Sequence, residues 1–294
     1  MAEKETENIE NFTRLRILKE DTRTGELYGE LGMDEYYVAK KVTPARKHLT
    51  RCKKPYVWVI YQAATHLLET LPKKHVAMLF YLATYFGYEG YLTTGKKPIR
   101  KTQLPQLLDV GKTTAYRFWT NIVEAGIARE DEQGPLHLNK QFFDRGQLRR
   151  KRLATMASQN VYVTRLYITS IRDLYKNATP TSRSALSYLF QVLPFVSREY
   201  NVVCRNPLEQ DLDEVVPMKL EELCDAIGYD KANASRLLSE LMRLKFTVGS
   251  KETWAVGYVA TGRLSDRRQR ELFINPAVYY AGRDWEAVKV LGKF

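Results

Sequence analysis

The sequence predicts a mainly α-helical fold with small β-wings, an α+β arrangement in which two tandem winged helix-turn-helix domains arise from internal duplication. Two observations predict it. Residues 98–127 align without a gap with residues 217–246, at an offset of 119. In each copy, apolar periodicity and turn residues follow the order helix, strand, helix, turn, helix and strand pair.

The alignment between the copies covers both apolar and charged positions. Phe118 falls on Leu237, Lys112 on Lys231 and Arg117 on Arg236. Upstream, residues 71–86 align with 179–194, and downstream residues 138–146 align with 274–282. The second copy therefore carries two insertions, as expected of loops. The domains expected from this pattern are an acidic N-terminal segment plus basic arm (1–54), a first winged helix (55–148), a basic linker (149–160) and a second winged helix with a long wing (161–294).

Each expected element has its own local signal. The first copy gives a helix at 78–86, a strand at 90–94, a helix at 101–108, a turn at 109–111, a recognition helix at 112–125 and a compact wing at 126–138. The second copy gives a helix at 181–196, a strand at 198–205, a helix at 219–227, a turn at 228–230, a recognition helix at 231–244 and strand-like pieces up to residue 276.

The stretch DVGKTTAYRFW, residues 109–119, allows a second interpretation, because Gly-Lys-Thr-Thr also ends a nucleotide-binding P-loop. A P-loop needs a glycine five positions before its Gly-Lys, and this chain has Gln106 there. Pro105 removes a backbone amide that the phosphate cradle would use. The segment before it is charged and amphipathic rather than a buried strand. The sequence therefore favours a turn at Gly111 and a helix that begins at Lys112.

The charge distribution suits a polyanionic partner. The net charge is +12, although residues 1–35 carry ten acidic against five basic side chains. Basic clusters lie at residues 40–54 and 145–152. Such clusters release condensed counterions when they neutralise phosphates. A solvated surface that keeps the protein soluble is the alternative explanation.

A recognition helix presents its N-terminal half to base edges in the major groove. The candidate DNA-binding residues in the two helices are Lys112, Thr113, Tyr116, Arg117, Lys231, Asn233, Ser235 and Arg236. The long wing adds Arg263, Arg267, Arg268 and Arg270, which could reach a minor groove or phosphates. Two alternatives stay open: the helices could bind protein, and the wing arginines could form a solvated hairpin tip.

Catalytic and metal-binding patterns are missing from the sequence. The four histidines form no His-x-His or His-Glu-x-x-His motif, and Cys52, Cys204 and Cys224 lack zinc spacing. We therefore expect no enzyme activity, no cofactor and no metal. A nickase or recombinase tyrosine stays open among the 19 tyrosines. The acidic N-terminus, the odd cysteine count and the short apolar runs predict a cytoplasmic protein with buried thiols and no membrane span.

The ending of the second copy, residues 271–291, resembles the close of winged-helix plasmid and phage replication proteins of Gram-positive bacteria. These have an Asn-Pro strand, an aromatic pair, a glycine and a Trp-containing tail. Residues 20–29 resemble their Thr-Gly-Glu hairpin, which here would form around Thr24 and Gly25. The tandem arrangement is also similar to two-domain initiators of iteron plasmids. The first copy departs from this pattern, because it has Asn139-Lys140 where the second has Asn275-Pro276.

The resemblance implies a replication initiator that binds repeats of double-stranded DNA at an origin and represses its own promoter. The implied partners are that DNA, a second copy of the chain and host replication proteins, with no membrane. A transcriptional regulator of a mobile element or phage is the alternative. The basic run up to Lys54 is either a DNA-contacting arm or a helix that packs on the first copy.

Overall fold

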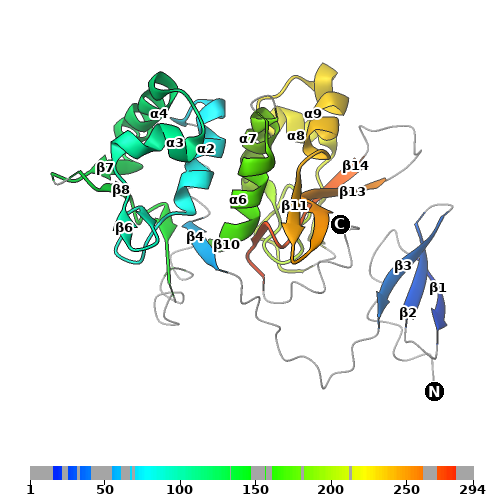
Figure 1. Cartoon of the computed structure of the whole chain (residues 1–294). Helices are drawn as coiled ribbons and strands as arrows, with labels where there is room; N and C mark the ends of the chain where they lie inside the picture. The colour runs from blue at the N-terminus through cyan, green and yellow to red at the C-terminus, as the bar shows by residue number, and fades with distance from the viewer. Residues whose placement is uncertain are drawn as a thin grey trace.

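The computed structural model describes residues 16–21, 26–31, 34–40, 55–60, 67, 70–132, 134–146, 156, 161–179, 182–211, 214–260 and 270–282, and for residues 16–40 the backbone alone. Near the start of the chain, β1 (Arg16–Asp21), β2 (Glu26–Leu31) and β3 (Asp34–Lys40) form an antiparallel sheet in that order (Figure 1). β1 and β2 flank the expected hairpin and pair with each other. β3 was not anticipated from the sequence.

The first half of the remaining chain begins with a strand and ends with another. Its elements are β4 (Tyr56–Ile60), α2 (Lys73–Ala83), β5 (Thr93–Thr94), β6 (Lys97–Pro98), the 3₁₀ helix η2 (Lys101–Gln103), α3 (Leu104–Leu108), α4 (Lys112–Glu124), β7 (Ala128–Glu130), β8 (Leu136–Leu138) and β9 (Phe143–Asp144). β5 pairs with β6, and β7 pairs with β8. The expected strand at 90–94 is reduced to β5 and to bridges at Tyr91 and Leu92.

The second half follows a similar order with additional elements. They are β10 (Val163–Tyr167), α6 (Ile168–Asn177), α7 (Arg183–Val192), η3 (Leu193–Phe195), α8 (Leu220–Ala226), η5 (Lys231–Asn233), α9 (Ala234–Leu241), β11 (Lys245–Val248), β12 (Lys251–Trp254), β13 (Val256–Ala260), β14 (Arg270–Ile274) and β15 (Tyr279–Tyr280). The expected strand at 198–205 forms only isolated bridges, through Val202, Val203 and Cys204.

A four-stranded antiparallel sheet, in the order β15–β10–β4–β9, joins the two halves. In its centre Trp58 pairs with Arg165, and Tyr56 and Tyr167 pair at one end of the same ladder. At the two edges, Val59 pairs with Phe143 and Leu166 pairs with Tyr279. Phe143 and Tyr279, which align in the repeat, therefore take equivalent places at the two edges, about an approximate two-fold axis through the central pair.

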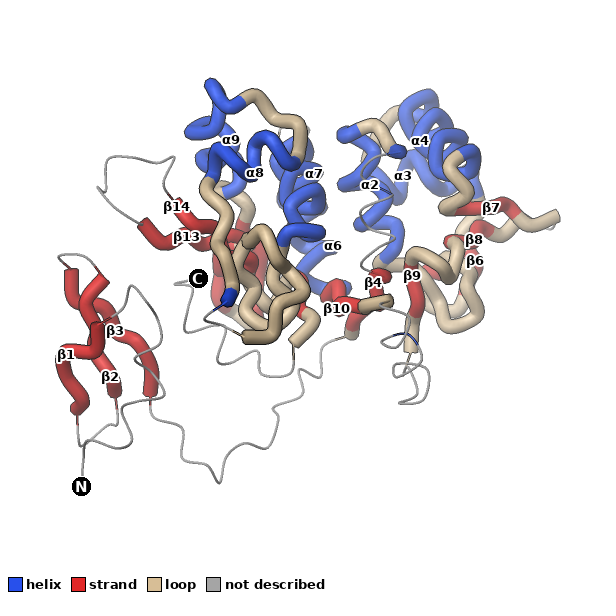
Figure 2. The backbone as a smooth tube through the Cα atoms, turned by 180° about the vertical axis from the view of Figure 1, so that it is seen from behind, coloured by secondary structure: helices blue, strands red, loops and turns tan. Residues whose placement is uncertain are grey.

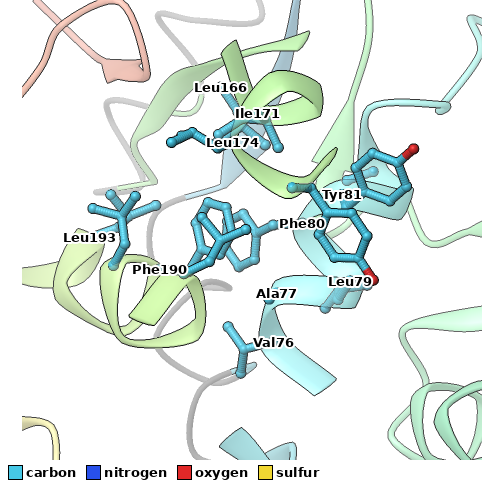
Figure 3. Packing of buried hydrophobic residues seen from close by; sticks show 14 of the residues in the cluster. Val76, Ala77, Leu79, Phe80, Tyr81, Leu166, Ile171, Leu174, Phe190 and Leu193 are labelled. Carbon is cyan, nitrogen blue, oxygen red and sulfur yellow. The ribbon is translucent and has the colours of Figure 1, made fainter. Parts of the chain in front are cut away.

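The helices continue this relation, because α2 of the first half packs against α7 of the second (Figures 1 and 2). The fully buried rings of Phe80 and Phe190 lie against each other (Figure 3) and stack with centroids 4.3 Å apart. Tyr81 of α2 stacks in the same way on Tyr175 of α6, at 4.0 Å. One cluster of buried apolar residues extends through both halves, so the halves share a single hydrophobic core.

The predicted fold class is wrong. Among the described residues there are fifteen strands, which form the four-stranded sheet, the N-terminal three-stranded sheet and several small hairpins, so the chain is not clearly a mainly α-helical tandem winged helix. The single long wing expected in the second copy is replaced by two hairpins, β11–β12 and β13–β14. Apolar periodicity reports only local structure, whereas the four-stranded sheet pairs strands that are more than 80 residues apart in the sequence.

Candidate nucleic-acid interface

α4 starts directly after a tight turn. Asp109 ends α3 in the left-handed conformation, with φ 50° and ψ 55°, and Gly111 precedes α4 with an extended backbone. Ala115, Phe118, Trp119 and Ile122 are buried, at the i, i+3, i+4 and i+7 spacing of one helix face. The P-loop interpretation does not fit this structure, because residues 104–108 are helical where a P-loop would need a glycine-rich loop.

Burial of that face leaves the predicted residues of α4 in solvent. Lys112, Thr113, Tyr116 and Arg117 are all exposed. The Tyr116 ring, 37% exposed, has the ammonium of Lys101 5.8 Å from its centroid. Within the described part of the chain, no carboxylate lies within ion-pair distance of Lys112 or Arg117. Both cations are therefore available to an anionic partner.

η5 and α9 present a lysine and an arginine at the positions that align with those of α4, but local carboxylates bind them. Lys231 Nζ lies 2.6 Å from Asp225, Asn233 donates to Asp230 at 2.8 Å, and Arg236 Nε lies 2.9 Å from Glu240. Asp225 and Glu240 raise the pKa of Lys231 and of Arg236, respectively. Ser235 is exposed.

The carboxylates beside α9 oppose the binding of another anion only weakly, because solvent screens exposed ion pairs of this kind. The Arg236 side chain is 74% exposed. A phosphate or a guanine edge can therefore replace the carboxylate partner at small cost.

α4 of the first half and α9 of the second half lie at the same end of the molecule. Figures 1 and 2 show both helices at the end remote from β4 and β10 of the four-stranded sheet. The structure thus places the predicted residues of the two helices on one end, although the sequence contained no information on their relative position.

The predicted wing arginines add nothing to this geometry. Arg263, Arg267 and Arg268 lie outside the described residues, and Arg270 begins β14 with its side chain outside them as well. Lys101, which lies over Tyr116, was missed as a candidate, because its position two elements upstream of α4 gave no local signal.

The histidines, cysteines and carboxylates of the described residues are the side chains that a metal site would require. No three His, Cys, Asp or Glu side chains among these residues are placed to hold a metal ion. Cys204 and Cys224 are free and buried, and burial raises the pKa of the Cys204 thiol to about 12. No helix within the described ranges has the length and apolar character that crossing a membrane requires.

A cleft opens where the two halves meet. Its lining includes Gln103, Gln106 and Asp109 from the first half and Tyr175, Lys176 and Arg183 from the second. Asp109 and Arg183 form an ion pair on its wall, with Nη2 and Oδ2 2.5 Å apart. The cleft therefore contains a contact between the halves.

No family model, curated protein or solved structure matches the chain. The functional argument accordingly depends on the chain's own residues.

Proposed function

We propose that the protein binds double-stranded DNA sequence-specifically through the exposed N-terminal halves of α4 and η5–α9, and that it serves as a replication initiator at the origin of a plasmid or phage. One observation carries the DNA-binding part. Two helices that each follow a tight turn present aligned cations, Lys112 with Lys231 and Arg117 with Arg236, at one end of the molecule.

The side chains suit base reading as well as phosphate binding. Arginine can pair bidentately with guanine and asparagine with adenine, while Thr113 and Ser235 can bind phosphates. The high positive charge adds an electrostatic, salt-dependent attraction to the duplex. The initiator role is supported by the resemblance of residues 271–291 to replication proteins.

The approximate two-fold relation of the halves defines the expected site. Two half-sites should lie in roughly inverted orientation, one helical turn apart, because α4 and α9 must enter successive major grooves. Their sequences should differ, since Thr113 aligns with Ala232 and Tyr116 with Ser235. The site is therefore expected to be inverted in geometry without being a strict palindrome.

Selection from randomised duplex DNA followed by footprinting tests this function. We expect a motif of about two helical turns, and copies of it in an AT-rich region beside the coding sequence if the protein is an initiator. If copies of the motif occur only across promoters, they would support a transcriptional regulator instead. Failure to enrich any motif, with binding lost at moderate salt, would contradict specific recognition altogether.

Single substitutions connect the motif to the helices. Arg117→Ala and Arg236→Ala should each weaken specific binding by about 1–3 kcal/mol and relax preference at one base position in different half-sites. Lys97→Ala is the matched control, because this exposed lysine lies in β6, at the sheet end of the first half (Figure 1). An equal loss in the control would show that total charge, and not α4 and α9, determines binding.

A further inference from the structure

A basic side chain from each half of the molecule donates hydrogen bonds to the turn before the candidate DNA-binding helix of the other half. Lys73, the first residue of α2, donates from Nζ to the carbonyl oxygens of Ile227 (3.1 Å) and Gly228 (2.7 Å), at the end of α8. Arg183, the first residue of α7, donates from Nη1 to the carbonyl oxygen of Asp109 (2.8 Å), at the end of α3. Asp109 and Gly228 align in the repeat, so the two contacts are reciprocal.

The position of Lys73 and Arg183 in the first turn of their own helices is electrostatically unfavourable. A positive side chain in the first turn of a helix lies at the positive end of the helix dipole, and neither α2 nor α7 has an acidic residue there. At the ends of α3 and α8 the same cations meet unsatisfied carbonyl groups, where positive charge is favourable. The main-chain carbonyl groups of the opposite half therefore offset this unfavourable placement of Lys73 and Arg183.

The Arg183 contact is more than a surface ion pair. Its side chain is only 16% exposed, its guanidinium lies 4.9 Å from the centroid of the Tyr175 ring, and it also pairs with the Asp109 carboxylate. The Tyr175 hydroxyl, from α6, donates to the carbonyl oxygen of Leu108 at 2.8 Å. Two carbonyl groups in the last residues of α3 and its turn are thus bound by the second half.

Both held turns lead directly into the helices with the candidate DNA-binding residues. Asp109 lies three residues before Lys112, and Gly228 lies three residues before Lys231. A shift of either turn would move the helix that follows it, because the chain between them is too short to absorb the displacement.

From these contacts we infer that Lys73 and Arg183 are positioning residues that act across the halves: Lys73, in the first half, sets the orientation of α9, and Arg183, in the second half, sets that of α4. The inference deepens the proposed function and rests on it for its consequence on DNA. The two contacts fix the relative orientation of α4 and α9, and with it the spacing and quality of the half-sites that one chain accepts.

The first test needs no DNA. Spin labels on cysteines at Thr120, in α4, and at Arg243, in the turn directly after α9, report the distance between these two segments; both residues are exposed. Cys52 is replaced by Ser, and the buried Cys204 and Cys224 are retained. We expect one narrow distribution for the otherwise unchanged chain and a broadened or shifted one for the Lys73→Met/Arg183→Met double variant. Lys74→Met is the matched control, as an exposed neighbour in the same first turn. An unchanged distribution in the double variant would overturn the inference.

The second test uses the selected DNA motif. Lys73→Met should reduce base discrimination about three- to tenfold in the half-site read by α9, and Arg183→Met should do so in the half-site read by α4, with tolerance of altered spacing in both. Arg183→Lys should restore part of the discrimination. If Lys73→Met instead affected only the half-site read by α4, and Arg183→Met only the half-site read by α9, action across the halves would be contradicted.

The two tests separate the inference from the proposed function. If no DNA motif is selected but the label distances change as expected, the function is wrong and the positioning contacts stand. If a motif is selected but neither distances nor discrimination respond to the Met variants, the function stands and the positioning role is wrong.

Discussion

At the scale of single residues, His75 links the core to the exposed face of α4. It is buried on α2, its ring packs edge-on against Phe118 at 5.5 Å, and its Nδ1 lies 3.2 Å from the amide nitrogen of Asn121. An amide nitrogen donates, so Nδ1 accepts and the proton of the neutral ring lies on Nε2. Burial, with the nearby cations of Lys74 and Arg117, lowers the pKa of His75 from 6.5 to about 4.

This pKa predicts a pH dependence of stability. The unfolded chain binds a proton at His75 near pH 6.5 and the folded chain only near pH 4, so the free energy of unfolding falls as the pH is lowered through this window and is unaffected above it. Between pH 7 and pH 5 the contribution should be about 2 kcal/mol.

Urea unfolding of the protein and of His75→Gln at both pH values measures this contribution. The variant should be less stable at pH 7, yet it should lose about 2 kcal/mol less than the original chain on acidification. His137→Gln serves as the control. Burial also lowers the pKa of His137, and this variant keeps His75 and therefore its contribution. Identical pH profiles for the chain with and without His75 would show that the fold does not lower the pKa of this histidine.

At the scale of elements, the end of α4 depends on a glycine. Gly126 has φ 70°, its amide donates to the carbonyl oxygen of Val123, and the next amide, of Ile127, donates to that of Ile122. This is the pattern of a helix end closed by a left-handed residue. A Cβ at position 126 would meet no heavy atom within 4 Å, so a substitution there costs backbone strain alone.

Gly126→Ala should therefore lower the free energy of unfolding by about 1–2 kcal/mol without a change in the fold. Gly126→Asn should cost less, because asparagine enters the left-handed region more readily. Equilibrium unfolding of both variants gives the comparison. A larger loss for Asn than for Ala would mean that the cost arises from contacts rather than from the backbone.

The elements that sequence could predict are those with a local signal. The turn at Asp109–Gly111 and the helix from Lys112 follow from a breaker and from apolar spacing, and both are found. The η5–α9 segment follows from the same pattern, and the Asp230 side chain accepts a hydrogen bond from the backbone amide of Ala232 at its start.

The remaining elements needed information from the other half. β4 was not anticipated, because a five-residue apolar run fits several structures until its partner strand is known. Likewise, the contacts of Lys73 and Arg183 join residues more than 70 positions apart. Exposure of the α4 residues was predictable from helix periodicity. The partner of Arg236 also has a local signal, because Glu240 lies four residues further along the same helix, although it was not anticipated from the sequence.

At the scale of the whole molecule, the shared sheet and core make the two halves one cooperative unit. β4 and β10 pair along five residues each, and Phe80 of the first half stacks on Phe190 of the second, with both rings fully buried. Separation of the halves would expose an edge of each strand and both aromatic faces. We therefore expect a single unfolding transition for residues 55–282, despite the repeat in the sequence.

Phe80→Ala tests this expectation, because it removes a ring that both halves contact. The cavity should lower the free energy of unfolding by about 3–5 kcal/mol and shift the whole transition to lower temperature. Phe118→Ala, which removes a fully buried ring from within the first half, is the matched control and should also shift the entire transition. Calorimetry on the three proteins decides the outcome, through agreement of the calorimetric and van 't Hoff enthalpies. Two resolved transitions, with Phe118→Ala moving only one of them, would show that the halves unfold independently.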